Sequence, residues 1–163
     1  MGDDVQDRLA ALEARVRELE DQAAILRLMN SWGPAVDTGL PEEAAALWTD
    51  DCVLDSDYAS LEGPAAIHEM TLSDGQQSLI TQGCAHVQGY PVIAVDGDRA
   101  TATGYSRVDL HTADGYEAWR VSANHWEFRR TPDGWRVARR TVRTIDGEEE
   151  PKRLLQRAFR SSA

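Results

Sequence analysis

Two side chains in this sequence have the chemistry to move a proton, the carboxylate of Asp37 and the imidazole of His86. Asp37 follows an apolar segment at residues 32–36, and His86 stands in a strand-like run at residues 83–87. Each also has a structural interpretation, Asp37 as a water-exposed turn residue and His86 as a hydrogen-bonded core group. In an apolar pocket, a histidine held by a carboxylate suits proton abstraction next to a carbonyl, or loss of a β-hydroxyl, without a cofactor.

Further polar residues alternate along the later part of the chain. Alternate positions of a strand share one face. By this alternation, Tyr105, Arg107 and Asp109 share one face of a strand. In the same way, Arg139, Thr141 and Arg143 share one face of another strand. Either set could face a pocket, but such alternation is also typical of the solvated face of a sheet.

The motifs indicate neither a metal site nor a nucleotide site. The histidines are His68, His86, His111 and His125, and no pair has metalloprotease or zinc-finger spacing. Cys52 and Cys84 fit no metal or redox motif, and we expect both to be packed thiols. The sequence has no glycine-rich phosphate loop and no Gly-x-Ser-x-Gly elbow. We therefore expect no metal and no cofactor.

The composition indicates one globular domain. The chain has 163 residues, of which 42% are hydrophobic and 28% charged, without an apolar stretch of the length of a membrane span. The net charge is −11, and residues 1–75 carry 17 acidic against 4 basic side chains, which disfavours nucleic acid and anionic membranes as partners. Residues 1–10 are acidic and polar, unlike a signal peptide, so we expect a cytoplasmic protein.

Residues 5–26 have the most regular hydrophobic pattern. Apolar side chains recur there at an alternating spacing of four and three, at Val5, Leu9, Leu12, Val16, Leu19, Ala23 and Leu26. This heptad stripe predicts a helix that packs on a partner, so we expect a homo-oligomer, a dimer or a larger assembly. Gly33 and Pro34 are expected to kink or end the helix, since proline lacks the amide hydrogen.

Helices precede strands in the rest of the chain. Two short helices are predicted at residues 41–48 and 63–72, with a strand at residues 52–57 between them, and residues 73–75 break the helical pattern. Four strand-like runs follow, at residues 83–95, 99–112, 116–130 and 135–145. The Asp-Gly turns between them predict hairpins in an antiparallel sheet. This order indicates an α+β domain with helices on one face of the sheet.

The order and spacing of five segments resemble the SnoaL-like branch of the NTF2-like superfamily. The segments are ILRLMNSWGPAVD (25–37), ALWTDDCVLD (46–55), EGPAAIHEM (62–70), GCAHVQGYPVIAVDGDRATATGYS (83–106) and RRTPDGWRVARRTVRTIDG (129–147). The resemblance implies an α+β cone, with a strongly curved antiparallel sheet closed by helices around a deep apolar pocket, commonly in a dimer. The chain then divides into a heptad helix extension (1–24), the SnoaL-like domain (25–147) and a tail with a short amphipathic helix (148–163).

Within the superfamily, the chain looks similar to bile-acid 7α-dehydratases and, more distantly, to scytalone dehydratase. In those enzymes a Tyr, an Asp and a His line the pocket, and the His removes a proton as water is eliminated. The resemblance implies that Asp37 and His86 are this Asp and His, and that Arg143 is a pocket arginine. Trp32 stands at the tyrosine position, where an indole cannot act as a phenolic acid.

Another group must then polarise the substrate, unless the substrate itself differs. The tyrosines that could do so are Tyr58, Tyr90 and Tyr105. The resemblance places Asp109 near a further pocket carboxylate of those enzymes. Trp32, Trp48 and Trp126 are candidates for apolar walls, with simple core packing as the alternative.

The expected function is that of a cofactor-independent lyase or isomerase acting on an apolar, polycyclic or polyketide-like hydroxy-carbonyl compound. His86 would act as base and then acid, Asp37 would orient it, and Arg143 with a tyrosine would polarise the carbonyl oxygen. One alternative is an epoxide hydrolase of the same fold, with Asp109, Arg107 and Arg143 as its polar group. A non-catalytic subunit, like the small β subunit of ring-hydroxylating dioxygenases, is another.

Overall fold

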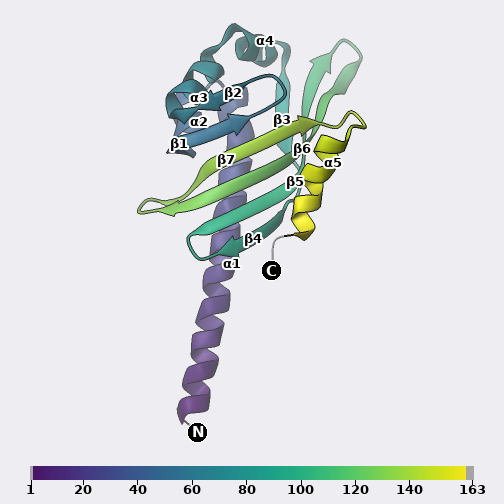
Figure 1. Ribbon diagram of the computed structural model, residues 1–163. Helices are drawn as coiled ribbons and strands as arrows, with labels where there is room; N and C mark the ends of the chain where they lie inside the picture. The colour runs from purple at the N-terminus through teal and green to yellow at the C-terminus, as the bar shows by residue number, and fades with distance from the viewer. Residues whose placement is uncertain (1, 161–163) are drawn as a thin grey trace.

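The computed structural model describes residues 2–160, in which helices pack on a curved seven-stranded sheet (Figure 1). The helices are α1 (Gly2–Asp37), α2 (Pro41–Ala46), α3 (Gly63–Leu72), α4 (Asp74–Gln82) and α5 (Glu149–Gln156), followed by the 3-10 turn η1 (Arg157–Phe159). The strands are β1 (Trp48–Asp55), β2 (Ser60–Glu62), β3 (Cys84–Gln88), β4 (Val92–Asp96), β5 (Arg99–Thr112), β6 (Gly115–Thr131) and β7 (Gly134–Thr144). The predicted α+β architecture, with a curved sheet and a long N-terminal helix, is confirmed.

The sheet has the strand order β2-β1-β7-β6-β5-β3, and β4 also pairs with β5. The predicted hairpins between β4 and β5, β5 and β6, and β6 and β7 are all present, with Gly97, Gly115 and Gly134 at their turns. One pair departs from the antiparallel prediction, because β1 runs parallel to β7. This pairing places β7 between β1 and β6.

The strand predicted at residues 83–95 is two strands, β3 and β4, which both pair with β5. Pro91 cannot donate a hydrogen bond to the ladder. Gly89 passes close to β5, where its amide donates to the carbonyl of Tyr105 at 2.8 Å. The interruption leaves Tyr90 exposed to solvent.

The first helix does not end at Gly33 and Pro34, so the predicted end of the helix at this point is wrong. Helix α1 continues for one more turn to Asp37. The turn is closed by Thr38, whose amide and hydroxyl both donate to the carbonyl of Pro34, at 3.2 and 2.6 Å. These bonds satisfy the carbonyl of Pro34 at the end of the helix, while Pro34 itself has no amide hydrogen to donate.

Helix α4 has no counterpart in the sequence-based prediction, which takes residues 73–75 as a break. Ser73 is instead the N-cap of the helix, and its Oγ accepts a hydrogen bond from the amide of Gln76 at 3.3 Å. The two predicted short helices are found as α2 and α3. Helix α2 ends at Ala46, before the predicted end, because Trp48 begins β1.

The core lies between α1, α2, α3 and one face of the sheet. Its centre is a cluster of rings from four residues, Trp32, Trp48, Trp126 and Phe128. The side of α1 that faces it carries Ile25, Met29, Trp32 and Val36, spaced by four and three residues. Helix α5 packs on the opposite face of the sheet, against β6 and β7 (Figure 1).

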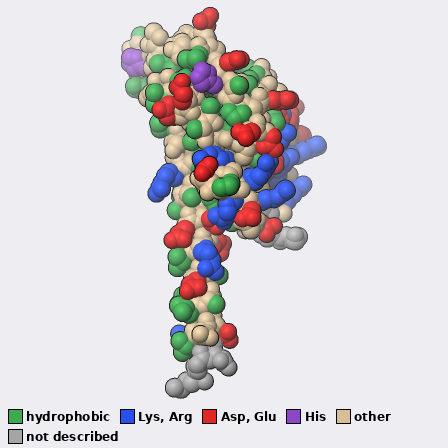
Figure 2. Space-filling model, turned by 90° about the vertical axis from the view of Figure 1, so that its left-hand side faces the viewer, with side chains coloured by type: hydrophobic (Ala, Val, Ile, Leu, Met, Phe, Trp, Pro, Cys, Tyr) green, Lys and Arg blue, Asp and Glu red, His purple; other side chains and the backbone are tan. Residues whose placement is uncertain are grey.

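The first half of α1 extends away from the rest of the molecule (Figure 1), and hydrophobic side chains recur along it (Figure 2). Its stripe of Val5, Leu9, Leu12, Val16 and Leu19 is exposed. The heptad positions therefore have no partner within the part of the chain that the structure describes. Neither this helix nor any other in residues 2–160 has the apolar stretch needed to cross a bilayer.

Candidate functional site

Asp37 and His86 meet where the end of α1 packs on β3. Oδ1 of Asp37 lies 2.5 Å from Nδ1 of His86, and Oδ2 accepts the backbone amide of His86 at 2.6 Å. A third donor, Sγ of Cys84, lies 3.2 Å from Oδ1. Because an ionised carboxylate only accepts hydrogen bonds, the proton of the short contact is on Nδ1, and in the neutral imidazole the lone pair is then on Nε2.

Gly33 allows α1 to approach β3 closely enough for this contact. It precedes Asp37 by one helical turn, so the two residues lie on the same face of α1. A Cβ atom at Gly33 would lie 2.2 Å from the carbonyl oxygen of His86, which is closer than these atoms can approach. The glycine therefore sets the distance at which the helix presents Asp37 to the strand.

The hydrogen bonds around Asp37 fix its charge. Burial acts to raise the pKa of Asp37, but the hydrogen bonds from the ring and amide of His86, with a smaller one from Cys84, outweigh burial and lower it. Asp37 is therefore an anion at neutral pH. Burial, followed by the hydrogen bond to Asp37 and its charge, raises the pKa of Cys84 to about 12, so this side chain is a thiol.

Asp37, Cys84 and His86 also form a group whose ligand atoms lie close enough together to hold a metal ion. A metal would require Cys84 as a thiolate and a lone pair on Nδ1 of His86. In the folded chain both groups instead donate their hydrogens to Asp37. The arrangement therefore fits a hydrogen-bonded carboxylate and imidazole better than a metal centre.

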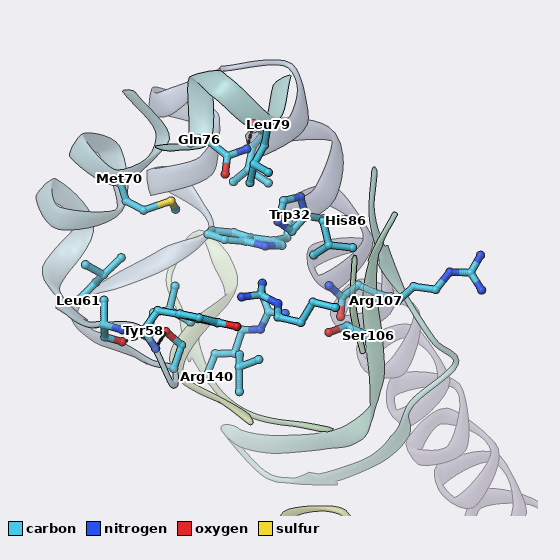
Figure 3. A pocket seen from close by; sticks show the side chains of 18 of the residues that line it. Trp32, Tyr58, Leu61, Met70, Gln76, Leu79, His86, Ser106, Arg107 and Arg140 are labelled. Carbon is cyan, nitrogen blue, oxygen red and sulfur yellow. Dashed lines mark hydrogen bonds between the residues drawn. The ribbon is translucent and has the colours of Figure 1, made fainter. Parts of the chain in front are cut away.

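His86 faces a cavity of about 230 Å³ between the sheet and helices α1, α3 and α4 (Figure 3). The walls are mainly apolar, with Trp32, Val36, Leu54, Leu61, Met70, Leu79, Val108 and Val142 among them. Asp37 does not line the cavity. The imidazole, with only 12% of its side chain exposed, therefore stands between the carboxylate and the cavity.

The polar side chains of the cavity lie at different parts of its wall. Figure 3 shows His86 beside Trp32, with Gln76 of α4 nearby, and Tyr58 and Arg140 across the cavity from α4. Among the described residues, none forms a hydrogen bond with Nε2 of His86. This nitrogen is therefore available to a bound molecule.

Arg140 is a buried cavity residue that the sequence analysis did not select. Its residue surface is 5% exposed, and its Nε and Nη2 donate to Oδ1 of Asn124 at 2.9 and 2.8 Å. The guanidinium carbon lies 4.1 Å from the ring centroid of Trp126. Burial, followed by the charge of Arg120, lowers the pKa of Arg140 to about 9, so the side chain remains a cation at neutral pH.

A β-bulge explains why Arg140 faces the cavity. Strict alternation from the buried Val137 would turn Arg139 and Arg143 inward. In β7, however, Val137 and Arg139 pair with consecutive residues of β6, which leaves Ala138 as an extra residue and reverses the alternation. The alternating pattern alone does not reveal this bulge.

Arg143 lies outside the cavity, in a cluster of acidic residues. Its Nη2 donates to Asp55 at 2.9 Å and its Nε to Glu150 at 2.6 Å, and Asp57 lies 3.8 Å away. These ion pairs connect β7 to β1 and α5. In this position Arg143 cannot polarise a molecule held beside His86.

The remaining candidates divide between the cavity and other parts of the molecule. The cavity is lined by Trp32, Tyr58 and Arg107, but not by Tyr90, Tyr105, Asp109 and Trp126. All three candidate tyrosines are exposed, but of these only Tyr58 also lines the cavity, and Trp126 is packed in the ring cluster. Nε of Arg107 donates to Asp109 at 2.8 Å, while Arg143 is held in its own cluster. The three residues of the epoxide-hydrolase alternative are therefore not brought together around the cavity.

A curved, open sheet and surrounding helices that enclose a cavity define this chain as a protein of the NTF2-like superfamily. The sequence profile of the SnoaL-like domain matches residues 17–141. The chain belongs to this SnoaL-like domain family.

Solved structures share this fold. An NTF2-like protein with a cystatin-like fold from Novosphingobium aromaticivorans is 39% identical, with a TM-score of 0.88 over 91% of this chain and 97% of that chain. A protein of unknown function from Mycobacterium tuberculosis is 24% identical, with a TM-score of 0.73 over 83% and 78% of the two chains. A protein from Catenulispora acidiphila is 20% identical, with a TM-score of 0.69 over 78% and 94%. No curated protein matches the sequence.

Proposed function

We propose that the protein is a cofactor-independent lyase or isomerase that acts on a largely apolar hydroxy-carbonyl compound, of polycyclic or polyketide type, bound in the cavity. The observation that carries the proposal is the contact between the Asp37 carboxylate and Nδ1 of His86 at the cavity wall. A histidine arranged in this way is a general base on one side and is held by an anion on the other.

The proposed reaction begins when Nε2 of His86 removes a proton from the carbon next to the carbonyl group. The electron pair of the broken C–H bond moves toward the carbonyl oxygen, and the imidazole becomes a cation. Asp37, an anion with 16% of its side chain exposed, stabilises this cation at short range. Its hydrogen bond from the backbone amide of His86 keeps the carboxylate from turning away.

His86 then returns the proton, and its destination decides the type of reaction. If the proton goes to a β-hydroxyl as the C–O bond breaks, water is eliminated and the protein is a lyase. If the enolate is conjugated with a C=C bond and the proton goes to the far carbon of that system, the double bond shifts, the product has the mass of the substrate and the protein is an isomerase. The same two groups serve both outcomes.

Tyr58 and Arg120 are the proposed donors to the carbonyl oxygen. Both line the cavity, and the guanidinium carbon of Arg120 lies 5.3 Å from the centre of the Tyr58 ring. A phenolic hydroxyl next to a cation is a good donor to an oxygen on which negative charge develops. Tyr58 thus takes the role that Trp32, with its indole, cannot fill.

The proposal is tested by incubating the protein with steroid, bile-acid and polyketide hydroxy-ketones and epoxides and by measuring product masses. The variants are His86→Gln and Asp37→Asn. His68→Gln is a matched control, because His68 lies outside the cavity and is partly exposed. A chelator added to the wild type tests whether a metal at the group of Asp37, Cys84 and His86 takes part.

We expect a product that is lighter by one water or isobaric with the substrate, formed by the wild type and His68→Gln and lost in His86→Gln. A product heavier by one water would assign an epoxide hydrolase instead. Binding without turnover of any compound would favour a non-catalytic role and contradict the proposal, as would full activity of His86→Gln.

A further inference from the structure

The cavity carries a positive charge that the protein does not balance. Arg120 and Arg140 line it, and among the described lining residues none is Asp or Glu. A third lining arginine, Arg107, extends away from the cavity (Figure 3). Arg107 is paired with Asp109, but within residues 2–160 no carboxylate lies within ion-pair distance of Arg120 or Arg140. Since the whole chain has a net charge of −11, the positive cavity is a local feature and not a consequence of composition.

Arg140 is held in a fixed orientation by neutral groups. Asn124 accepts both of its hydrogen bonds through Oδ1 and donates through Nδ2 to Oγ of Ser106 at 2.7 Å. The guanidinium has five N–H donors, and the bonds to Asn124 use one on Nε and one on Nη2. The edge formed by Nη1 and the second hydrogen of Nη2 has no acceptor among the described residues.

A free guanidinium edge of this kind matches a carboxylate, which accepts two parallel N–H···O bonds in one plane. A buried cation without a counter-charge is unfavourable for folding. Its presence at a cavity wall therefore indicates that the counter-charge comes with the ligand. Arg140 and His86 face the same cavity (Figure 3), so one molecule can contact both.

We propose that the ligand of this cavity is a carboxylic acid, bound as its anion to the Nη1 and Nη2 edge of Arg140. Arg120 adds a second positive charge at the cavity. The rings of Trp32, Tyr58 and Trp119 among the lining residues favour an aromatic or unsaturated acid. This inference rests on the proposed function, since it names the substrate class of the same site. Asn124 is a positioning residue that acts through Arg140.

Calorimetric titration of the full chain tests the inference. The probes are benzoate, cinnamate and 1-naphthoate, each paired with its amide, which has nearly the same shape and no charge. The variant is Arg140→Met. Arg99→Met is the matched control, because it also removes one positive charge but Arg99 lies outside the cavity.

We expect at least one of the carboxylates to bind the wild type about tenfold or more tightly than its amide, as for a hydrogen bond to a charged group. Arg140→Met should remove this preference, while Arg99→Met should keep it. Equal binding of acid and amide by the wild type, or no binding of any of the three acids at millimolar concentration, overturns the inference. The comparison of acid and amide binding by the wild type tests the inference even if Arg140→Met fails to fold.

The same titration with His86→Gln separates this inference from the proposed function. Carboxylate binding that persists in His86→Gln and in the wild type, without turnover of any hydroxy-ketone, would leave the ligand class standing and refute the catalytic role. Turnover that depends on His86 but shows no preference for acids over amides or esters would support the catalytic role and refute the carboxylic acid as the ligand class.

Discussion

Asp37 has two separate effects on His86, and they act on different atoms. Its Oδ1 accepts the Nδ1 hydrogen and so keeps the lone pair on Nε2, at the cavity. Its Oδ2 accepts the backbone amide and so fixes the carboxylate relative to β3. An amide side chain at this position could keep the second bond but could donate to Nδ1 and reverse the tautomer.

Replacing Asp37 by Asn is therefore expected to reduce kcat by about 100- to 10,000-fold, the range found when a general base is lost or held in the wrong tautomer. KM should change little, because Asp37 does not line the cavity. Steady-state kinetics on the compound identified by product mass measures both. An unchanged kcat would show that the carboxylate has no part in proton transfer.

The lowered pKa of Asp37 predicts how this variant affects stability with pH. Folding favours the charged carboxylate, so its stabilisation is present above the ordinary value of 3.8 and is lost as pH falls through the lower pKa of the folded state. Wild type should therefore exceed Asp37→Asn in stability most at neutral pH, with a gap that narrows in acid. Urea unfolding of both proteins between neutral pH and pH 3 checks this. A gap that widens in acid would contradict the hydrogen-bonded carboxylate.

Arg140 is predicted to reduce stability. Burial lowers its pKa to about 9, below the ordinary value of 12.5. The unfolded chain therefore binds the proton more tightly than the folded chain, and the charged side chain lowers the free energy of unfolding at any pH below about 9. Arg140→Met should melt at the same temperature as wild type or higher, as when buried charges are replaced by apolar groups. Thermal melts at neutral pH test this. A clear loss of stability would mean that its bonds to Asn124 are structural.

The sequence reveals some of these residues and not others. Asp37 and His86 could be selected as candidates because a carboxylate and an imidazole stand out in apolar segments, and the family resemblance implies that they belong to one site. Arg140 could not, since a single extra residue at Ala138 reverses which face of β7 points inward. The same reversal turns Arg143 toward Asp55 and Glu150, whereas the family resemblance places it in the pocket.

Helix α1 and strand β3 form the element pair on which the site depends, and Gly33 is the point of closest approach. Gly33→Ala should cost about 1–3 kcal/mol of stability, as for overpacking of a core, and should displace Asp37 from His86. Gly75→Ala is the matched control, since it lies in helix α4 with its nearest neighbour 4.0 Å from the added Cβ. Chemical unfolding measures both variants. Equal stability of the two would contradict the close packing of α1 on β3.

Turn chemistry explains which elements could be foreseen. The Asp-Gly pairs before β5, β6 and β7 predict hairpins because their glycines take positive φ angles that other residues avoid. Ser73, Asp74 and Gly75 have a similar turn-like composition, but Ser73 caps a helix there. Only the residues that follow distinguish a helix cap from a turn. In α4 these residues are mostly polar, so they do not form the apolar pattern that would predict a helix.

For the molecule as a whole, the stripe of Val5, Leu9, Leu12, Val16 and Leu19 is an apolar surface without a partner in the described chain. Association of two copies through this stripe would bury it in coiled-coil fashion. We expect the wild type to be a dimer, and the double variant L12E/V16E to be a monomer. Light scattering after gel filtration measures the masses, with Glu13→Gln as the control on a charged position of the same helix.

A chain lacking residues 1–20 should behave like that double variant. It keeps Asp21, which bonds Arg130 at 2.7 Å and Trp135 at 2.9 Å and connects α1 to β6 and β7. A monomeric wild type, or a dimer that survives both changes, would assign the stripe no role in assembly.

The central claim is that His86 and Asp37 remove a proton from carbon in a bound carbonyl compound. The most direct measurement is proton NMR of hydroxy-ketones incubated in deuterium oxide with the protein, since exchange at the carbon next to the carbonyl reports proton removal even when no product accumulates. The account predicts exchange with the wild type and His68→Gln, and none above background with His86→Gln. Equal exchange in all three samples, or no exchange with the wild type, would contradict it.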